Sequence, residues 1–133
     1  MRSVVIAIPL TLAALAVLAG GCGKSSQQPP PGSGTPSVQQ EAQAMFEKRC
    51  AVCHGIGGAG DGPSADSFQP RPHDYTDPAW QASVTDDQIK EIILKGGANL
   101  GKSPAMPSNT LLRERPEVLD GLVKIIRGFG KRP

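Results

Sequence analysis

Residues 50–54 read Cys50-Ala51-Val52-Cys53-His54, and the rest of the chain is best understood outward from them. Two cysteines stand three positions apart, and a histidine follows the second one directly. This is the spacing of the c-type haem attachment motif. Each thiol can form a thioether with one of the two vinyl groups on the same haem edge, and the histidine then lies beneath the iron. The motif predicts one covalent haem c, attached through Cys50 and Cys53 and ligated by His54.

Three other kinds of site are compatible with two close cysteines. A zinc site could combine them with His54 and His73, although neighbouring Cys and His side chains rarely point at one tetrahedral ion. A redox-active pair requires a βαβ setting, whereas here a helical pattern precedes the motif and a Gly-rich stretch follows it. A structural disulfide across two intervening residues would be strained or exchangeable.

Helical patterns lie on both sides of the motif. Strong helix formers predict a first helix that starts near Gln40 and delivers Cys50 at its end. A capping box and an isoleucine-rich face predict a second helix over residues 85–95. A third helix is expected to begin at Pro116 and to end at Gly128. No strand pair is indicated, so the predicted fold is all-α, with three main helices and long loops around one haem.

Residues 41–127 resemble the class I (mitochondrial-type) cytochrome c family in its short bacterial form. In that family a helix with a small residue and then an aromatic precedes the haem motif, and Ala42 and Phe46 stand eight and four residues before Cys50. The resemblance implies the class I cytochrome c fold. It also places Ile125 where the family has an aromatic on the last helix, which is a departure in packing.

The Gly-rich run 55–63 is similar to the turn that follows the motif in this family. The resemblance implies that the Pro63 carbonyl accepts the second N–H of His54 and fixes the imidazole ring. Without the resemblance, Gly62-Pro63 is only a turn.

Met106 is the candidate for the sixth iron ligand. It lies in the Pro-rich loop 103–107, 52 residues after His54, and this loop resembles the methionine loop of the same family. His73 is the rival ligand, and a methionine can also simply fill a core. His/Met ligation raises the reduction potential and fills both axial positions, which favours electron transfer over catalysis.

The haem is expected to supply much of the core, because aromatic residues make up only 4% of the chain. Tyr75 and Trp80 are candidates to donate hydrogen bonds to a haem propionate, and half-buried packing is the alternative for both. The side chains expected to cover the haem are Ile89, Ile92, Ile93, Leu94, Leu111, Leu122 and Ile126.

The N-terminus reads as an export signal. Residues 1–21 combine a short basic start with an apolar run that is short for a membrane span, and they are interpreted as a lipoprotein signal peptide. Cys22 follows a sequence that resembles a lipobox, which implies lipidation there and leaves only Cys50 and Cys53 for haem. Residues 22–39 are expected to be a flexible tether and residues 40–133 the cytochrome c domain. The expected location is therefore extracytoplasmic, on a membrane.

The net charge and its distribution indicate which macromolecules the protein is expected to bind. A net charge of +2 with scattered basic residues gives no stripe for phosphate-backbone binding, so a nucleic acid partner is not expected. Lys95 and Lys102 near the Met106 loop are candidates to steer an acidic redox protein, and an ordinary solvated surface is the alternative.

The predicted function is that of a monohaem electron carrier, not an enzyme, in an extracytoplasmic respiratory chain. No small-molecule substrate is expected, and the donor and acceptor are redox proteins. The alternatives are a haem subunit of a larger membrane redox complex, and a haem enzyme or gas sensor with an open sixth site.

Overall fold

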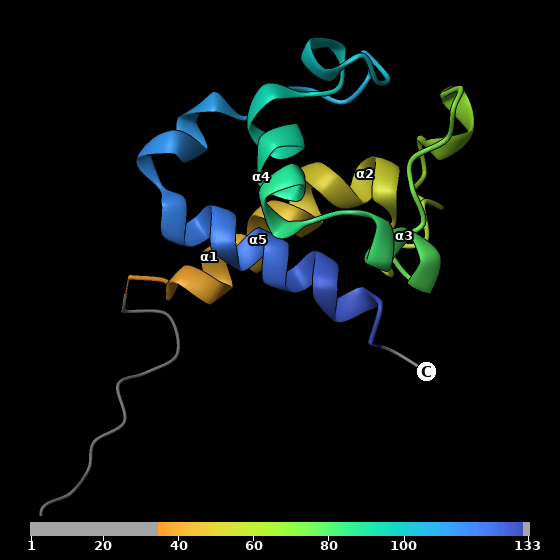
Figure 1. Ribbon diagram of the computed structural model, residues 1–133. Coiled ribbons are helices and arrows are strands. Elements are labelled where there is room, and N and C mark those ends of the chain that lie inside the picture. The colour runs from red at the N-terminus through yellow and green to blue at the C-terminus, as the bar shows by residue number, and fades with distance from the viewer. Residues whose placement is uncertain (1–34, 132–133) are drawn as a thin grey trace, which may run out of the picture. The chain divides into compact units, whose positions relative to one another are not determined.

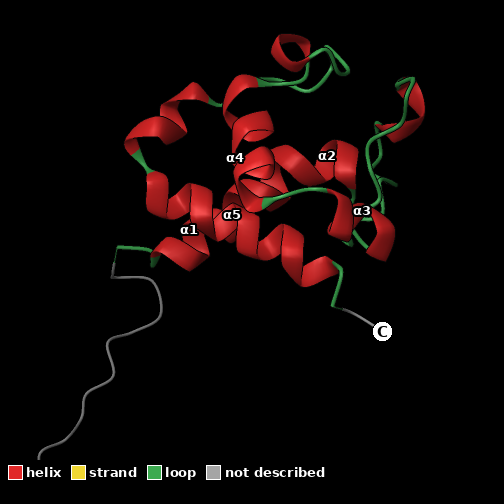
Figure 2. Cartoon of the chain, in the orientation of Figure 1, coloured by secondary structure: helices red, strands yellow, loops and turns green. Residues whose placement is uncertain are grey.

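The structure, a computed structural model, describes residues 35–131, and every regular element in that part of the chain is a helix. Figures 1 and 2 show α1 (Val38–Met45), α2 (Ala51–His54), α3 (Pro78–Ser83), α4 (Asp86–Lys95) and α5 (Pro116–Phe129). A π-helical turn, Phe46–Cys50, joins α1 to α2, and short 3₁₀ turns lie at Ala65–Ser67, Ala98–Leu100 and Thr110–Glu114. The predicted all-α class is confirmed. The predicted signal peptide, lipidated Cys22 and most of the predicted tether lie outside the described residues.

The first helix begins two residues before the expected start. Ser37 accepts a hydrogen bond from the Gln40 backbone N–H (3.2 Å), and the Gln40 side chain accepts one from the Ser37 N–H (2.8 Å). This reciprocal capping box satisfies two of the N–H groups that a helix end leaves free. The helical path then continues through the π-helical turn into α2, so one nearly continuous segment carries Cys50, Cys53 and His54.

Helices α1 and α5 form the centre of the core. Buried Ala42 of α1 faces Gly121 of α5, and the rings of Phe46 and Phe129 meet with centroids 5.2 Å apart. The aromatic of the last helix is therefore Phe129. The assignment of that position to Ile125 is wrong, because Ile125 is only partly buried beside the core.

Helix α4 packs against α5 and closes the core on one side (Figure 1). Its predicted capping box, Thr85 with Gln88, is present, and Ile89 and Ile93 are buried. Helix α3 was not predicted as an element; Asp77 caps it by accepting from the Ala79 N–H (2.8 Å).

Leu111, expected to cover the haem, is 82% exposed, and its neighbour Leu112 is buried instead. The 3₁₀ turn there places only one of the two leucines against the core. Among the residues that the structure describes, no helix has the length and apolar character needed to cross a bilayer.

Candidate functional site

One large cavity, of about 790 Å³, lies where the motif meets two loops. Its walls come from the motif segment 48–54, the loop 68–73 and the loop 97–107, with Ile92 and Asn109 completing the lining. Cys50, Cys53, His54 and Met106 all line it. Met106 stands 52 residues after His54 in sequence, yet the predicted thioether cysteines and both predicted axial ligands line one space.

Cys50 and Cys53 are free, partly buried thiols on the same wall of the cavity. Burial raises the pKa of Cys50 to about 11, although the nearby Arg49 charge opposes this. The Cys50 thiol is therefore protonated at neutral pH. Within residues 35–131 no three His, Cys, Asp or Glu side chains are grouped to hold a metal ion, so the four-residue zinc set weighed from the sequence is not assembled.

His54 is held by an aromatic neighbour. Its ring stacks on Tyr75 with centroids 4.6 Å apart and an interplanar angle of 14°, and a hydrogen bond of 3.1 Å joins Nε2 to the Tyr75 hydroxyl. Burial lowers the pKa of the imidazole to about 4, with the His73 backbone opposing the shift. The ring is therefore neutral at pH 7, as a metal ligand must be.

The other ring nitrogen of His54, Nδ1, is buried and has no hydrogen-bond partner in the described part of the chain. A buried polar atom without a partner is costly, and such atoms call for an explanation. A neutral imidazole beside two free thiols and a large cavity supplies the donor set of a covalently bound haem, in which one ring nitrogen would bind the iron and the other would keep a hydrogen-bond partner.

Glycines after His54 allow the wall behind it to pack closely. Gly58 has φ +78° and accepts a hydrogen bond from the Tyr75 N–H (2.7 Å), and a Cβ on it would stand 2.6 Å from the Phe129 ring. A Cβ on Gly60 would stand 2.4 Å from the Pro72 carbonyl oxygen. The turn and the segment 72–75 therefore meet backbone to backbone, and this contact places Tyr75 on His54.

Met106 enters the cavity from a loop fixed at its base. The Gly97 N–H donates to the Met106 carbonyl (3.0 Å), and the Met106 N–H donates to the Ser103 carbonyl (3.2 Å). The Met106 side chain is partly buried and packs against the core cluster. His73 lines the same cavity from another wall, with its ring 5.8 Å from that of Trp80, so both candidate ligands reach the site.

Three predicted site residues do not make the contacts that were predicted for them. Tyr75 and Trp80 are not among the cavity's described lining residues; Tyr75 contacts His54 instead, and the two aromatic rings pack together at 4.9 Å. Pro63 is exposed, and the structure records no hydrogen bond between its carbonyl and His54 within residues 35–131. Its role as the imidazole's partner stays a prediction.

Four basic side chains of the lining went unnoticed as a group in the sequence. They are Lys48, Arg49, Arg71 and Lys102, and no acidic residue of the described chain lines the cavity. The position of Lys48 and Arg49 directly before Cys50 was a usable signal. Arg71 depends on how the loop 68–73 folds, which no local pattern shows.

Comparison with known proteins adds one match. The model of a protein family described as cytochrome c matches residues 39–120, more than half of the chain. The matched range includes the motif at 50–54, the loop 68–73 and Met106. No curated protein matches the chain.

Proposed function

The chain belongs to the cytochrome c family, whose members bind haem and transfer electrons, and from this premise we propose that it carries one electron at a time on a single haem c. In this proposal Cys50 and Cys53 hold the haem covalently, and His54 and Met106 are the axial ligands. The haem supplies an iron that cycles between the ferrous and ferric states.

The observation that carries the proposal is the convergence of four side chains on one cavity. Both motif thiols, the neutral imidazole and the Met106 thioether line it. Ligation by both His54 and Met106 would fill both axial positions and leave none for oxygen or peroxide. Ile92 and the loop prolines Pro70 and Pro104 contribute apolar side chains to the lining.

The chain's charges support docking of an acidic redox protein at the cavity. Of the two lysines selected from the sequence, Lys102 lines the cavity, whereas Lys95 is paired with Glu91 on α4 (2.6 Å). Lys48 and Arg49 add positive charge on the motif side. Complementary charge of this kind mainly raises association rates.

We also propose that the protein works outside the cytoplasm in a respiratory chain, anchored through a lipid on Cys22. The support is the N-terminal sequence: a basic start, a short apolar run and a cysteine after small residues. Acyl chains on that cysteine would hold the protein to a membrane while the cytochrome domain reaches its partners.

The test is expression of the whole chain with c-type haem maturation machinery. We expect one haem per chain that resists acid–organic extraction, and its loss in the double variant Cys50→Ser/Cys53→Ser. Cys22→Ser is the matched control, because it should remove the membrane anchor and leave the haem in place. Extractable haem would contradict covalent attachment.

Carbon monoxide separates the carrier from the other haem functions. The reduced protein is expected not to bind it at neutral pH, since Met106 would fill the sixth position. Ready binding would favour a haem enzyme or gas sensor. Co-purification with other redox subunits would favour a role within a larger membrane complex.

A further inference from the structure

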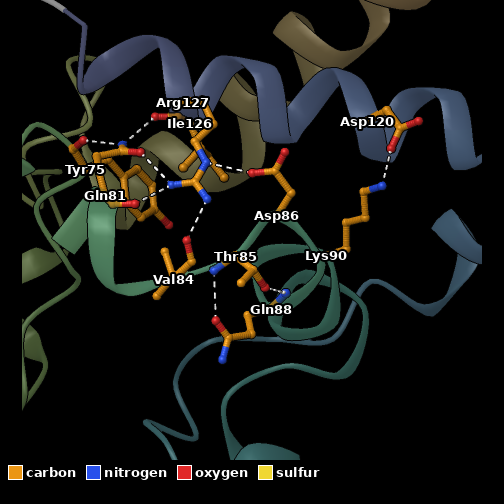
Figure 3. A network of polar contacts seen from close by, with 10 residues as sticks. All are labelled: Tyr75, Gln81, Val84, Thr85, Asp86, Gln88, Lys90, Asp120, Ile126 and Arg127. Atoms are coloured by element: carbon orange, nitrogen blue, oxygen red, sulfur yellow. Dashed lines mark hydrogen bonds and ion pairs between the residues drawn. The ribbon is translucent and has the colours of Figure 1, made fainter.

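Helix α4 is tied to α5 at its N-terminal end. The Arg127 guanidinium of α5 donates to the Asp86 carboxylate and to the Val84 carbonyl (2.7 Å each), as Figure 3 shows. About one turn further along α4, Lys90 pairs with Asp120 of α5 (2.6 Å) in the same view. The buried isoleucines of α4 belong to the same core cluster as the buried face of α5. Helix α4 therefore gives the cavity a support that is joined to the core.

The loop that carries Met106 returns to α4 at the C-terminal end of that helix, where carbonyl groups lack partners inside the helix. The Ile93 carbonyl accepts hydrogen bonds there from the Asn109 backbone N–H (3.0 Å) and from the Asn109 side-chain amide (3.2 Å). The same amide donates to the carbonyl of Pro107 (3.4 Å), the residue directly after Met106. Asn109 thus links the segment next to Met106 with helix α4.

An exchange of hydrogen-bond partners at Gly97 explains why the Ile93 carbonyl is open to Asn109. If the helix continued, the Gly97 N–H would donate to the Ile93 carbonyl four residues earlier. It donates instead to the Met106 carbonyl (3.0 Å), and Asn109 supplies donors to Ile93 in its place. A Cβ on Gly97 would overlap the Ser103 carbonyl oxygen, so the two backbones lie in contact. The end of α4 and the Met106 loop therefore form one hydrogen-bonded unit.

From these contacts we propose that Asn109 is the positioning residue of Met106, because its amide fixes the loop on α4 and so keeps the thioether at the iron. The inference rests on the proposed function, in which Met106 is the sixth ligand. The contacts use main-chain atoms and the Asn109 amide, and none of them occupies the Met106 sulfur or a nitrogen of His54. They are therefore compatible with a bound haem. Loss of the amide should make the thioether easier to displace.

The experiment uses the full-length, haem-loaded protein in the ferric state, with imidazole as a competing sixth ligand. Titration followed by the loss of the sulfur-to-iron charge-transfer band gives the apparent affinity for imidazole. Asn109→Leu keeps a similar side-chain size and removes both side-chain donors. We expect this variant to bind imidazole about fivefold more tightly than wild type, which is the equivalent of one hydrogen bond.

Asn109→Asp is the second variant. It keeps the shape of the side chain, but its carboxylate cannot donate to either carbonyl, so the imidazole affinity should shift in the same direction. Asn99→Leu is the matched control, because the Asn99 amide donates to the Lys95 carbonyl (2.6 Å) at the same helix end and Asn99 is not among the cavity's described lining residues. Its imidazole affinity should stay within about twofold of wild type.

An imidazole affinity equal to wild type in both Asn109 variants would overturn the proposal, even if denaturant unfolding showed them to be less stable. An equal increase in Asn99→Leu would also overturn it, since the effect would then belong to the end of α4 in general. Failure of the proposed function is distinguishable, because the wild-type protein would then lack the charge-transfer band before any imidazole is added.

Discussion

At the scale of single residues, the site depends on glycines that stand where a larger side chain would not fit. Gly58 combines a left-handed backbone with contact against Phe129, and its carbonyl holds the Tyr75 N–H. Only glycine adopts this conformation at little cost. The residue therefore links the backbone of the haem motif's turn to the partner of His54.

Gly58→Ala is expected to lower the free energy of unfolding by roughly 2 kcal/mol, through backbone strain and the clash with Phe129. Denaturant unfolding of the haem-loaded protein measures this. Gly57→Ala is the matched control, since its Cβ would meet nothing within 4 Å, and its effect should stay within about 0.5 kcal/mol. Equal losses in both variants would refute the role given to Gly58.

At the scale of helices, the crossing of α1 and α5 is set by small residues. A Cβ on Gly121 would stand 2.7 Å from the Cβ of Ala42, which is fully buried. Gly121→Ala should destabilise by roughly 1 kcal/mol or more, because overpacking outweighs the gain of about 1 kcal/mol in helix propensity. Denaturant unfolding again gives the value.

Gly128 supplies the control on the same helix. An added Cβ there meets nothing within 4 Å, so Gly128→Ala should leave stability unchanged or raise it by about 0.5 kcal/mol. If Gly121→Ala were the more stable of the two variants, the close α1–α5 contact would be wrong.

The N-terminus of α5 carries an acid-sensitive contact. Arg115 donates to Glu117 (2.7 Å) and to Glu41 of α1 (2.7 Å), and its hydrogen bond lowers the pKa of the Glu117 carboxyl. Because this pKa is lower in the folded state, the stabilisation is present above the carboxyl's unfolded pKa and is lost as pH falls through the folded value.

The difference in free energy of unfolding between wild type and Glu117→Gln should therefore be largest at neutral pH and should disappear as the pH falls. The pair is exposed, so the difference should be small and should shrink with added salt. Glu114→Gln is the control, because Glu114 is in none of the ion pairs of the described residues. A difference that widened in acid would contradict this reading of Glu117.

The helices could be predicted where chemical signals mark their ends. Thr85 with Gln88 and the glycine pair after Lys95 gave α4, and Pro116 gave the start of α5. The same kind of signal, Ser37 with Gln40, was present for α1 and was missed. Helix α3 has too few residues for an apolar period to show.

The motif side chains at the cavity were also predictable, because their chemistry lies in adjacent residues. The loop contacts were not. Tyr75 is positioned beside His54 by contacts with Gly58 and Gln81, and Gln81 in turn is bonded to Arg127. Phe129, and not Ile125, packs against Phe46. These contacts join distant parts of the chain, so only the folded structure determines them.

At the scale of the whole molecule, the described lining of the proposed haem site carries basic side chains and no acidic ones, with Arg71 paired to Asp66 beside it. Electron transfer to ferricyanide, an anionic probe, should slow as ionic strength rises, and Lys102→Glu should weaken that dependence. Lys124→Glu makes the same charge change on exposed α5, away from the cavity lining, and should have the smaller effect. Stopped-flow rates measured over a series of salt concentrations compare the two variants. Equal effects of both substitutions would mean that the attraction depends on net charge alone.

The most direct test of the account is the optical spectrum of the ferric, haem-loaded protein compared with that of Met106→Ala. We predict a low-spin wild-type spectrum with a sulfur-to-iron charge-transfer band, lost in Met106→Ala and retained in both His73→Ala and Met45→Leu, which alters the other methionine in the described residues. A band that is absent from wild type or survives in Met106→Ala would contradict ligation by Met106. A spectrum that changes only in His73→Ala would give the sixth position to His73.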